Sequence, residues 1–147
     1  MDGYSLLHSW PELAQGRARH SAAARTALVN ILRQYGDAVS TPITVVFDGA
    51  GPSAAQEVPS TPEMEVIYSK TGQTADDIIE RVAARLVEYG EVLVVSNDIA
   101  ERDTVTSVGG SCSSCEHFVR TIQSVLSEFG RTLERHNLAE RQRFKKR

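Results

Sequence analysis

The sequence is poor in cysteine and lacks any long apolar run. Only two cysteines occur among its 147 residues, too few for the disulfide framework of a small secreted domain. No stretch approaches the ~20 apolar residues that a membrane-spanning helix needs. Asp2 follows Met1 directly, which does not fit a signal peptide. These absences argue against a secreted or membrane-bound protein. They predict that the protein is located in the cytoplasm or in another non-secreted compartment.

The net charge is also small, but it is unevenly distributed. The whole chain carries −3, whereas residues 131–147 hold seven Lys or Arg and two Glu, a net +5. The preceding 130 residues therefore carry −8. We expect one domain over residues 1–130, long enough to bury a core, and a basic tail over residues 131–147 that forms a helical C-terminal extension. The near-neutral net charge of the whole chain would argue against a nucleic-acid-binding protein. The division into an acidic body and a basic tail does not argue against one.

The apolar pattern predicts alternating strands and helices. Short β-branched runs predict strands at residues 43–47, 64–68, 92–95 and, as a short fourth, 104–107. Apolar residues at helical spacing predict helices at residues 20–35, 75–89 and 115–129. Thr74 is a plausible N-cap, and Gly130 weakens the last helix. This alternation predicts an α/β fold with a mostly parallel central sheet flanked by helices.

Acidic residues fall at the ends of these elements. Asp48 and Asp98 follow predicted strands, Asp76 and Asp77 open a predicted helix, and Asp2 lies at the start of the sequence. The carboxyl ends of parallel strands and the starts of the following helices share one edge of the sheet. Carboxylate oxygens are the ligands that Mg²⁺ and Mn²⁺ prefer. The pattern therefore indicates a metal site at this edge.

Each aspartate also has a structural interpretation. Asp is common in turns and at helix N-caps, and the helix dipole favours acids such as Asp76 and Asp77 in a first turn. The metal hypothesis therefore depends on four separate parts of the sequence meeting at one edge.

Several short motifs occur in a characteristic order. They are DGY at 2–4, HSWPEL at 8–13, VVFDG at 45–49, VIYS at 66–69, TADDIIE at 74–80, VVSND at 94–98, and Gly109–Gly110 with Ser114. In this order and spacing they resemble the YacP-like branch of the NYN family over residues 2–129.

The resemblance implies a fold like that of PIN and FLAP-type nucleases, and a metal-dependent ribonuclease. One branch of the family is an endoribonuclease that acts on messenger RNA in translating ribosomes. By position, Asp2, Asp76 and Asp98 match the family's catalytic metal-binding acids, while Asp77 and Asp48 match less constant acidic positions. The implied cofactor is Mg²⁺ or Mn²⁺, and the implied partner is RNA, either messenger or ribosome-associated, with no membrane involved.

The sequence departs from the family at two places. Ser5 stands where the family usually has Asn, and only Met1 precedes Asp2 where the family has a hydrophobic strand. We therefore expect that first strand to be missing or truncated in the given sequence: either the true start lies upstream, or the chain pairs the gap in another way. Both departures favour an alternative function, an inactive RNA- or ribosome-binding module that keeps the fold.

The basic tail is a candidate RNA-binding segment. Its cations are Arg141, Arg143, Lys145, Lys146 and Arg147, preceded by Arg131 and Arg135. Such a run can neutralise backbone phosphates, but it is also typical of a solvated helix end or a disordered terminus.

Other candidate sites are weaker. Cys112 and Cys115 form a C-x-x-C that fits a redox pair or half a zinc site, but we interpret them as incidental cysteines at a helix start. Trp10 is predicted to fill the core at a turn. A phosphatase that uses Asp48 is disfavoured, because such enzymes usually need a second Asp where Ala50 stands.

Overall fold

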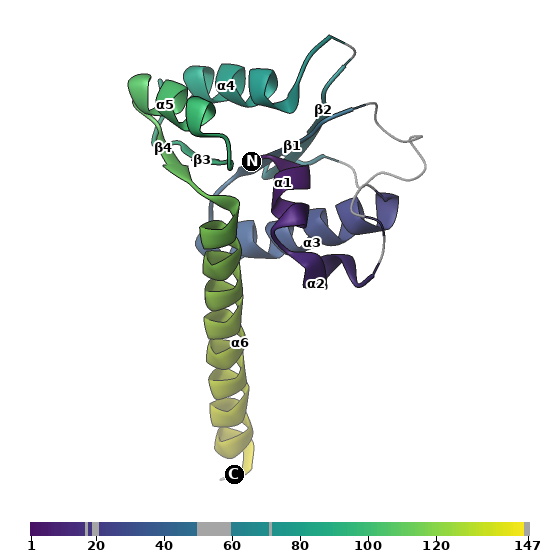
Figure 1. The fold of residues 1–147 in the computed structure, drawn as a ribbon. Coiled ribbons are helices and arrows are strands. Elements are labelled where there is room, and N and C mark those ends of the chain that lie inside the picture. The colour runs from purple at the N-terminus through teal and green to yellow at the C-terminus, as the bar shows by residue number, and fades with distance from the viewer. Residues whose placement is uncertain (17, 19–20, 50–59, 71, 146–147) are drawn as a thin grey trace.

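A computed structural model of the chain describes residues 1–16, 18, 21–49, 60–70 and 72–145. Helices and strands alternate within a body, from which the last helix projects (Figure 1). The elements are α1 (Gly3–His8), α2 (Pro11–Ala14), α3 (Ala22–Val39), β1 (Ile43–Phe47), β2 (Met64–Tyr68), α4 (Ala75–Leu86), β3 (Leu93–Val95), α5 (Ile99–Ser107), β4 (Ser111–Ser113) and α6 (Cys115–Lys145). The predicted α/β class is confirmed.

The described strands form two parallel pairs. β1 pairs with β2, with Ile43 opposite Met64 and Phe47 opposite Tyr68. β3 pairs with β4, with Leu93 opposite Ser111. The prediction of parallel strands is therefore confirmed. β1 is almost entirely buried, whereas β2 lies at an edge and is largely half-exposed.

Residues 1 and 2 join the two pairs. The amino nitrogen of Met1 donates to the carbonyl oxygen of Thr44 at 2.9 Å, and the N–H of Val46 donates to the carbonyl oxygen of Met1 at 2.8 Å. On the other side, the N–H of Asp2 donates to the carbonyl oxygen of Val95 at 3.1 Å. Asp2 forms a parallel bridge with Val46. The strands therefore follow the order β2, β1, residues 1–2, β3, β4.

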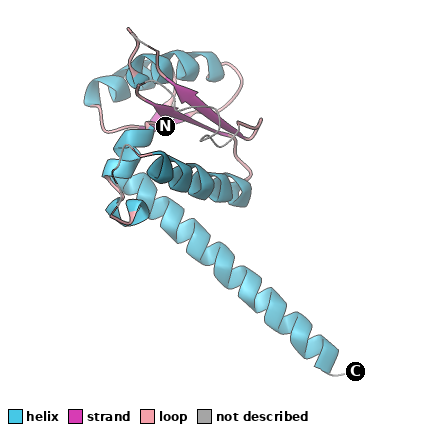
Figure 2. Ribbon diagram, turned by 90° about the vertical axis from the view of Figure 1, so that its right-hand side faces the viewer, coloured by secondary structure: helices cyan, strands magenta, loops and turns pink. Residues whose placement is uncertain are grey.

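Helices cover both faces of this arrangement (Figure 2). On one face, α1, α2, α3 and the first half of α6 bury a cluster that includes Leu6, Leu28, Leu32, Phe118 and Ile122. On the other face, α4 and α5 bury a second cluster that includes Val46, Ile79, Val94 and Val105. β1 contributes to both clusters because its side chains alternate between the two faces.

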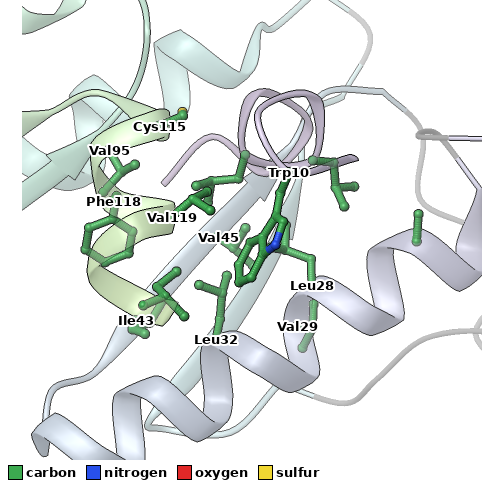
Figure 3. Close-up of a cluster of buried hydrophobic side chains, with 14 of the residues drawn as sticks. Trp10, Leu28, Val29, Leu32, Ile43, Val45, Val95, Cys115, Phe118 and Val119 are labelled. Carbon is green, nitrogen blue, oxygen red and sulfur yellow. The ribbon is translucent and has the colours of Figure 1, made fainter. Parts of the chain in front are cut away.

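The first two helices were not predicted from the sequence, but their residues are central to the larger cluster. Trp10, between α1 and α2, is only 5% exposed and lies near Leu28 and Val29 of α3 (Figure 3). Its predicted place in the core is confirmed. A Cβ atom on Gly3 would collide with the ring of Phe47, so only glycine allows α1 to lie this close to β1.

The prediction of a strand at residues 104–107 is wrong. These residues belong to α5, where the hydroxyls of Thr104 and Thr106 donate to the carbonyl oxygens of Ala100 and Arg102, one turn earlier. The fourth strand is Ser111–Ser113 instead. A three-residue Ser-Cys-Ser strand carries no apolar alternation, so the β-branched Thr-Val-Thr run gave the stronger but misleading signal.

The predicted helices are present, with different bounds. α3 begins at Ala22 and continues to Val39, and α4 begins directly after its N-cap Thr74. α6 does not end near Gly130 but runs to Lys145. The predicted loop at 49–62 falls mainly on residues 50–59, outside the described residues. Within the described part of the chain, no helix has the length and apolar character needed to cross a bilayer.

We predict that Trp10→Ala destabilises the fold by about 3–5 kcal/mol, because it leaves a large cavity between α2 and α3. Chemical denaturation measures the loss. Leu133→Ala is the matched control, since Leu133 is 48% exposed on α6 and its truncation should change stability by less than about 0.5 kcal/mol. A similar effect for both variants would contradict the assigned core.

Candidate functional site

Asp2 lies between the two strand pairs and begins α1. It is the N-cap of α1, and its Oδ1 accepts the N–H of Ser5 at 3.2 Å. The Ser5 hydroxyl donates to Oδ2 at 2.9 Å. Both oxygens of Asp2 are thus oriented by one residue. Ser5, which departs from the family's usual Asn, supplies the side-chain contact.

Asp48 follows β1 and is oriented from β2. The hydroxyl of Ser69 donates to Oδ1 of Asp48 at 2.7 Å, and the same hydroxyl oxygen accepts the N–H of Gly49 at 2.8 Å. Ser69 is buried, and its own N–H donates to the carbonyl oxygen of Phe47. Ser69 therefore fixes the turn that presents Asp48.

Asp98 follows β3 and begins α5. As the N-cap, it accepts the N–H of Ala100 at Oδ1, at 2.9 Å. Its own N–H donates to the hydroxyl of Ser96, which is 1% exposed. The preceding residue, Asn97, accepts the N–H of Cys115 at its Oδ1, at 2.9 Å. The loop that carries Asp98 is therefore attached to the first residue of α6.

Asp76 and Asp77 lie in the first turn of α4. Asp77 is exposed and forms a capping box: its N–H donates to Oγ1 of Thr74, and its Oδ2 accepts the N–H of Thr74, both at 3.1 Å. Asp76 is half-buried. The predicted cap is confirmed, and it gives Asp77 a structural role in the start of the helix.

The backbone brings these acids to one edge of the sheet. Asp2 bridges to Val46, two residues before Asp48, and bonds to Val95, three residues before Asp98. α4 follows β2 and so begins on the same side. Nevertheless, among the residues that the structure describes, no three His, Cys, Asp or Glu side chains lie close enough together to hold a metal ion.

The donor set fits a hard cation, although three of the five side chains make helix-capping bonds. All the candidate ligands are carboxylates, which suit Mg²⁺ or Mn²⁺. Asp2, Asp77 and Asp98 accept backbone N–H groups of their own helices. A carboxylate has about four lone-pair positions, so a capping bond leaves acceptor capacity for a cation.

Ser69 orients Asp48, and sequence reasoning included it in a motif without assigning it that contact. The sequence nevertheless contained a signal for it. Ser69 follows β2 immediately, as Asp48 follows β1, and two parallel strands in register bring such residues side by side.

The remaining candidates that the structure describes lie in β4 and α6. Arg141 and Arg143 are exposed near the end of α6, Lys145 is its last residue, and Lys146 and Arg147 lie outside the described residues. Cys115 is buried as the first residue of α6, as expected for a cysteine at a helix start, and Cys112 lies in β4.

Comparison with known proteins identifies the family. The model of the YacP-like NYN domain matches residues 1–147. The chain belongs to the YacP-like NYN domain family. It therefore has a PIN-like nuclease fold, and divalent metals are general cofactors of nuclease domains of this class.

The matched sequence and the matched crystal structures come from Bacillus subtilis. The protein named "Uncharacterized protein YacP" of strain 168 is 25% identical over 126 residues, which is 85% of this chain and 74% of that protein. The crystal structure of Rae1 (YacP) has a TM-score of 0.74 at 23% identity, covering 91% of this chain and 78% of the other. A W164L mutant of Rae1 gives the same TM-score and identity, covering 92% and 80%. The structural likeness supports the fold of the NYN domain.

We predict that Asn97→Ala loosens the start of α6 in this NYN domain. The variant loses the acceptor for the N–H of Cys115, which should cost about 1 kcal/mol, as for other helix caps. Hydrogen exchange at the Cys115 amide should become faster, and the melting temperature should fall. Asn137→Ala, at an exposed position of α6, is the control. Unchanged exchange at Cys115 would show that Asn97 does not cap α6 in solution.

Proposed function

We propose that this NYN domain is a metal-dependent endoribonuclease that hydrolyses phosphodiester bonds in RNA. The observation that carries the proposal is the position of Asp2 in a family with a PIN-like fold: its backbone joins β1 and β3, the strands that lead to Asp48 and Asp98. Messenger RNA or ribosome-associated RNA of the cytoplasm is the proposed substrate.

Asp2, Asp76 and Asp98 are the proposed catalytic ligands of Mg²⁺ or Mn²⁺, assisted by Asp77 and Asp48. When bound, such an ion polarises the phosphate and makes water a better nucleophile. The residues of the chain orient the carboxylates.

The neighbouring hydroxyls and amides support this role. Ser5 holds both oxygens of Asp2, Ser69 holds Asp48, and Ser96 together with Asn97 holds the loop of Asp98. Positions fixed in this way reduce the reorganisation needed to bind a cation. The exposed cations of α6 would contact the phosphate backbone beyond the cleavage site.

An RNA- or ribosome-binding module without catalysis is the second candidate. It is favoured by the capping bonds that occupy Asp2 and Asp98 and by the lack of a three-acid group among the described residues. The two functions differ in their response to metal. A nuclease should bind Mn²⁺ in calorimetry and cleave RNA, whereas an inert module should do neither.

We predict that Asp76→Asn lowers cleavage of single-stranded RNA in Mn²⁺ by at least about 100-fold, because it removes one charge from the cation site. The thermal melt should be unchanged. Asp103→Asn, an exposed position of α5, is the matched control and should cleave normally. Full activity of Asp76→Asn would refute the assignment, and absence of cleavage and of Mn²⁺ binding in the unaltered protein would support the inert module.

We predict that the double variant Arg141→Gln, Arg143→Gln lowers the affinity for RNA. We also expect the affinity of this variant to depend less steeply on salt concentration. Each lost contact to single-stranded phosphate should reduce the slope of log affinity against log salt by about 0.7. Filter binding at several salt concentrations measures the slope. Arg81→Gln with Arg85→Gln on the exposed side of α4 is the control. Equal slopes for both double variants would exclude the tail as an RNA contact.

A further inference from the structure

Three aromatic rings form a row beside the acidic edge. The ring of Phe47 meets the ring of Tyr4 edge to face, with centroids 5.1 Å apart. It also stacks on the ring of Tyr68, with centroids 5.6 Å apart and 25° between the planes. Phe47 and Tyr68 lie opposite each other at the ends of β1 and β2. The row therefore runs from α1 across β1 to the edge strand β2.

Each ring is close in sequence to a residue of the acidic edge. Phe47 directly precedes Asp48, Tyr4 follows Asp2 by two residues, and Tyr68 directly precedes the serine that donates to Asp48. Successive side chains of a strand point to opposite faces. The rings lie on the face covered by α1 and α3, where they belong to the larger cluster or pack against it. A ligand that reaches the acids therefore passes close to the rings.

The rings differ in exposure and in polarity. Phe47 is fully buried, as expected for a core residue. Tyr4 and Tyr68 are only half-buried, and Tyr68 lies on an edge strand. A tyrosine suits a place where one end of the ring is apolar and the other is wet. Tyr68 therefore presents part of its ring at the margin of the core, next to the strand ends that carry the acids.

Positive charge flanks the row, although residues 1–130 carry a net charge of −8. Nη1 of Arg25, on α3, donates to the hydroxyl of Tyr4 at 3.2 Å. Lys70, two residues after Tyr68, is exposed and is the only lysine in residues 1–144. Cations at both ends of the row favour an anionic ligand, because they attract phosphate groups that the acids alone would repel.

An aromatic ring with cations nearby suits an unpaired nucleobase. Every base has a flat π-face, and single-stranded nucleic acids bind proteins by stacking bases on aromatic side chains beside positive charge. A base inside a duplex is stacked on its neighbours and paired, so its face is not available to a protein side chain. The row therefore favours single-stranded over double-stranded RNA.

We propose that Tyr68 stacks on an unpaired nucleobase of single-stranded RNA, beside the phosphate that lies at the acidic edge, with Phe47 as the buried support of the tyrosine ring. This role rests on the proposed function, since it takes RNA as the substrate, but it assigns a binding residue and not a step of cleavage. Stacking is tolerant of base identity. Tyr68 would therefore position the strand without selecting its sequence.

Binding is measured with a fluorescein-labelled, unstructured RNA of about 12 nucleotides, titrated with the complete 147-residue chain and followed by anisotropy. The titrations are made in EDTA and in Ca²⁺, and gel electrophoresis verifies that the RNA stays intact. Tyr68→Leu should weaken binding at least about fivefold, because it removes the stacking surface. Tyr68→Phe keeps the ring and should bind within about twofold of the unaltered chain.

Tyr35→Leu is the matched control. Tyr35 is also half-buried and meets a phenylalanine, Phe118, edge to face. It lies near Pro42 and Ile43, at the other end of β1. Its replacement should change RNA binding less than about twofold, because the ring is far from the acidic edge. Circular dichroism melts verify that all three variants fold.

Photocrosslinking identifies the contact independently of cleavage. The same RNA, with 5-iodouridine in place of uridine, is irradiated with the unaltered chain, and mass spectrometry locates the attached residue. We expect attachment at Tyr68. An excess of unlabelled single-stranded RNA should suppress it, whereas an equal excess of duplex RNA should not.

The outcomes separate this role from the nuclease activity. Attachment at Tyr68 without any cleavage in Mn²⁺ would support the stacking role and refute the nuclease. Cleavage in Mn²⁺ without attachment at Tyr68, and with equal binding by Tyr68→Leu, would overturn the stacking role alone. Absence of RNA binding would overturn both.

Discussion

The hydrogen bonds of residues 1 and 2 make one sheet out of two. Without them, β1–β2 and β3–β4 would be separate two-stranded pairs, and such pairs are marginal on their own. The same bonds place Asp2 between Val46 and Val95, and therefore beside the strand ends that carry Asp48 and Asp98. Continuity of the sheet and placement of the acidic edge thus depend on the same interaction.

The acids at this edge could serve as helix caps or as ligands of a cation, and the two roles differ in whether they need a negative charge. A helix N-cap needs an oxygen acceptor, and Asn provides one nearly as well as Asp. A cation site needs the negative charge, which Asn lacks. The capping bonds of Asp2 and Asp98 explain an acceptor at each position, and the helix dipole adds a modest preference for a negative charge there. Asp48 does not cap a helix and accepts the hydroxyl of the buried Ser69, so helix capping does not account for an acid at this position.

The sequence predicts elements whose burial imposes a periodic pattern. β1, β2 and α4 have such patterns, and the edge position of the acids follows from parallel strands. Elements held by a few backbone bonds could not be predicted in this way. The β4 strand Ser111–Ser113 is too short and polar to show a period, and the bridging role of Met1 comes only from contacts with distant strands. α6 extends past Gly130 because one glycine costs about 1 kcal/mol, which a 31-residue helix tolerates.

The length of α6 also explains how an acidic domain can carry a basic segment while the charges of the two regions do not neutralise each other. Its first half is anchored by Phe118 and Ile122, while Leu133 and Leu138 are about half exposed as it leaves the body (Figure 1). At 1.5 Å per residue, residues 131–145 span ~22 Å, well beyond the ~8 Å Debye length at physiological salt. Cations near a helix C-terminus also suit its dipole. The exposed Arg141 and Arg143 are therefore screened from the acidic edge. The electrostatic potential stays positive around the end of α6 and negative around the acidic edge.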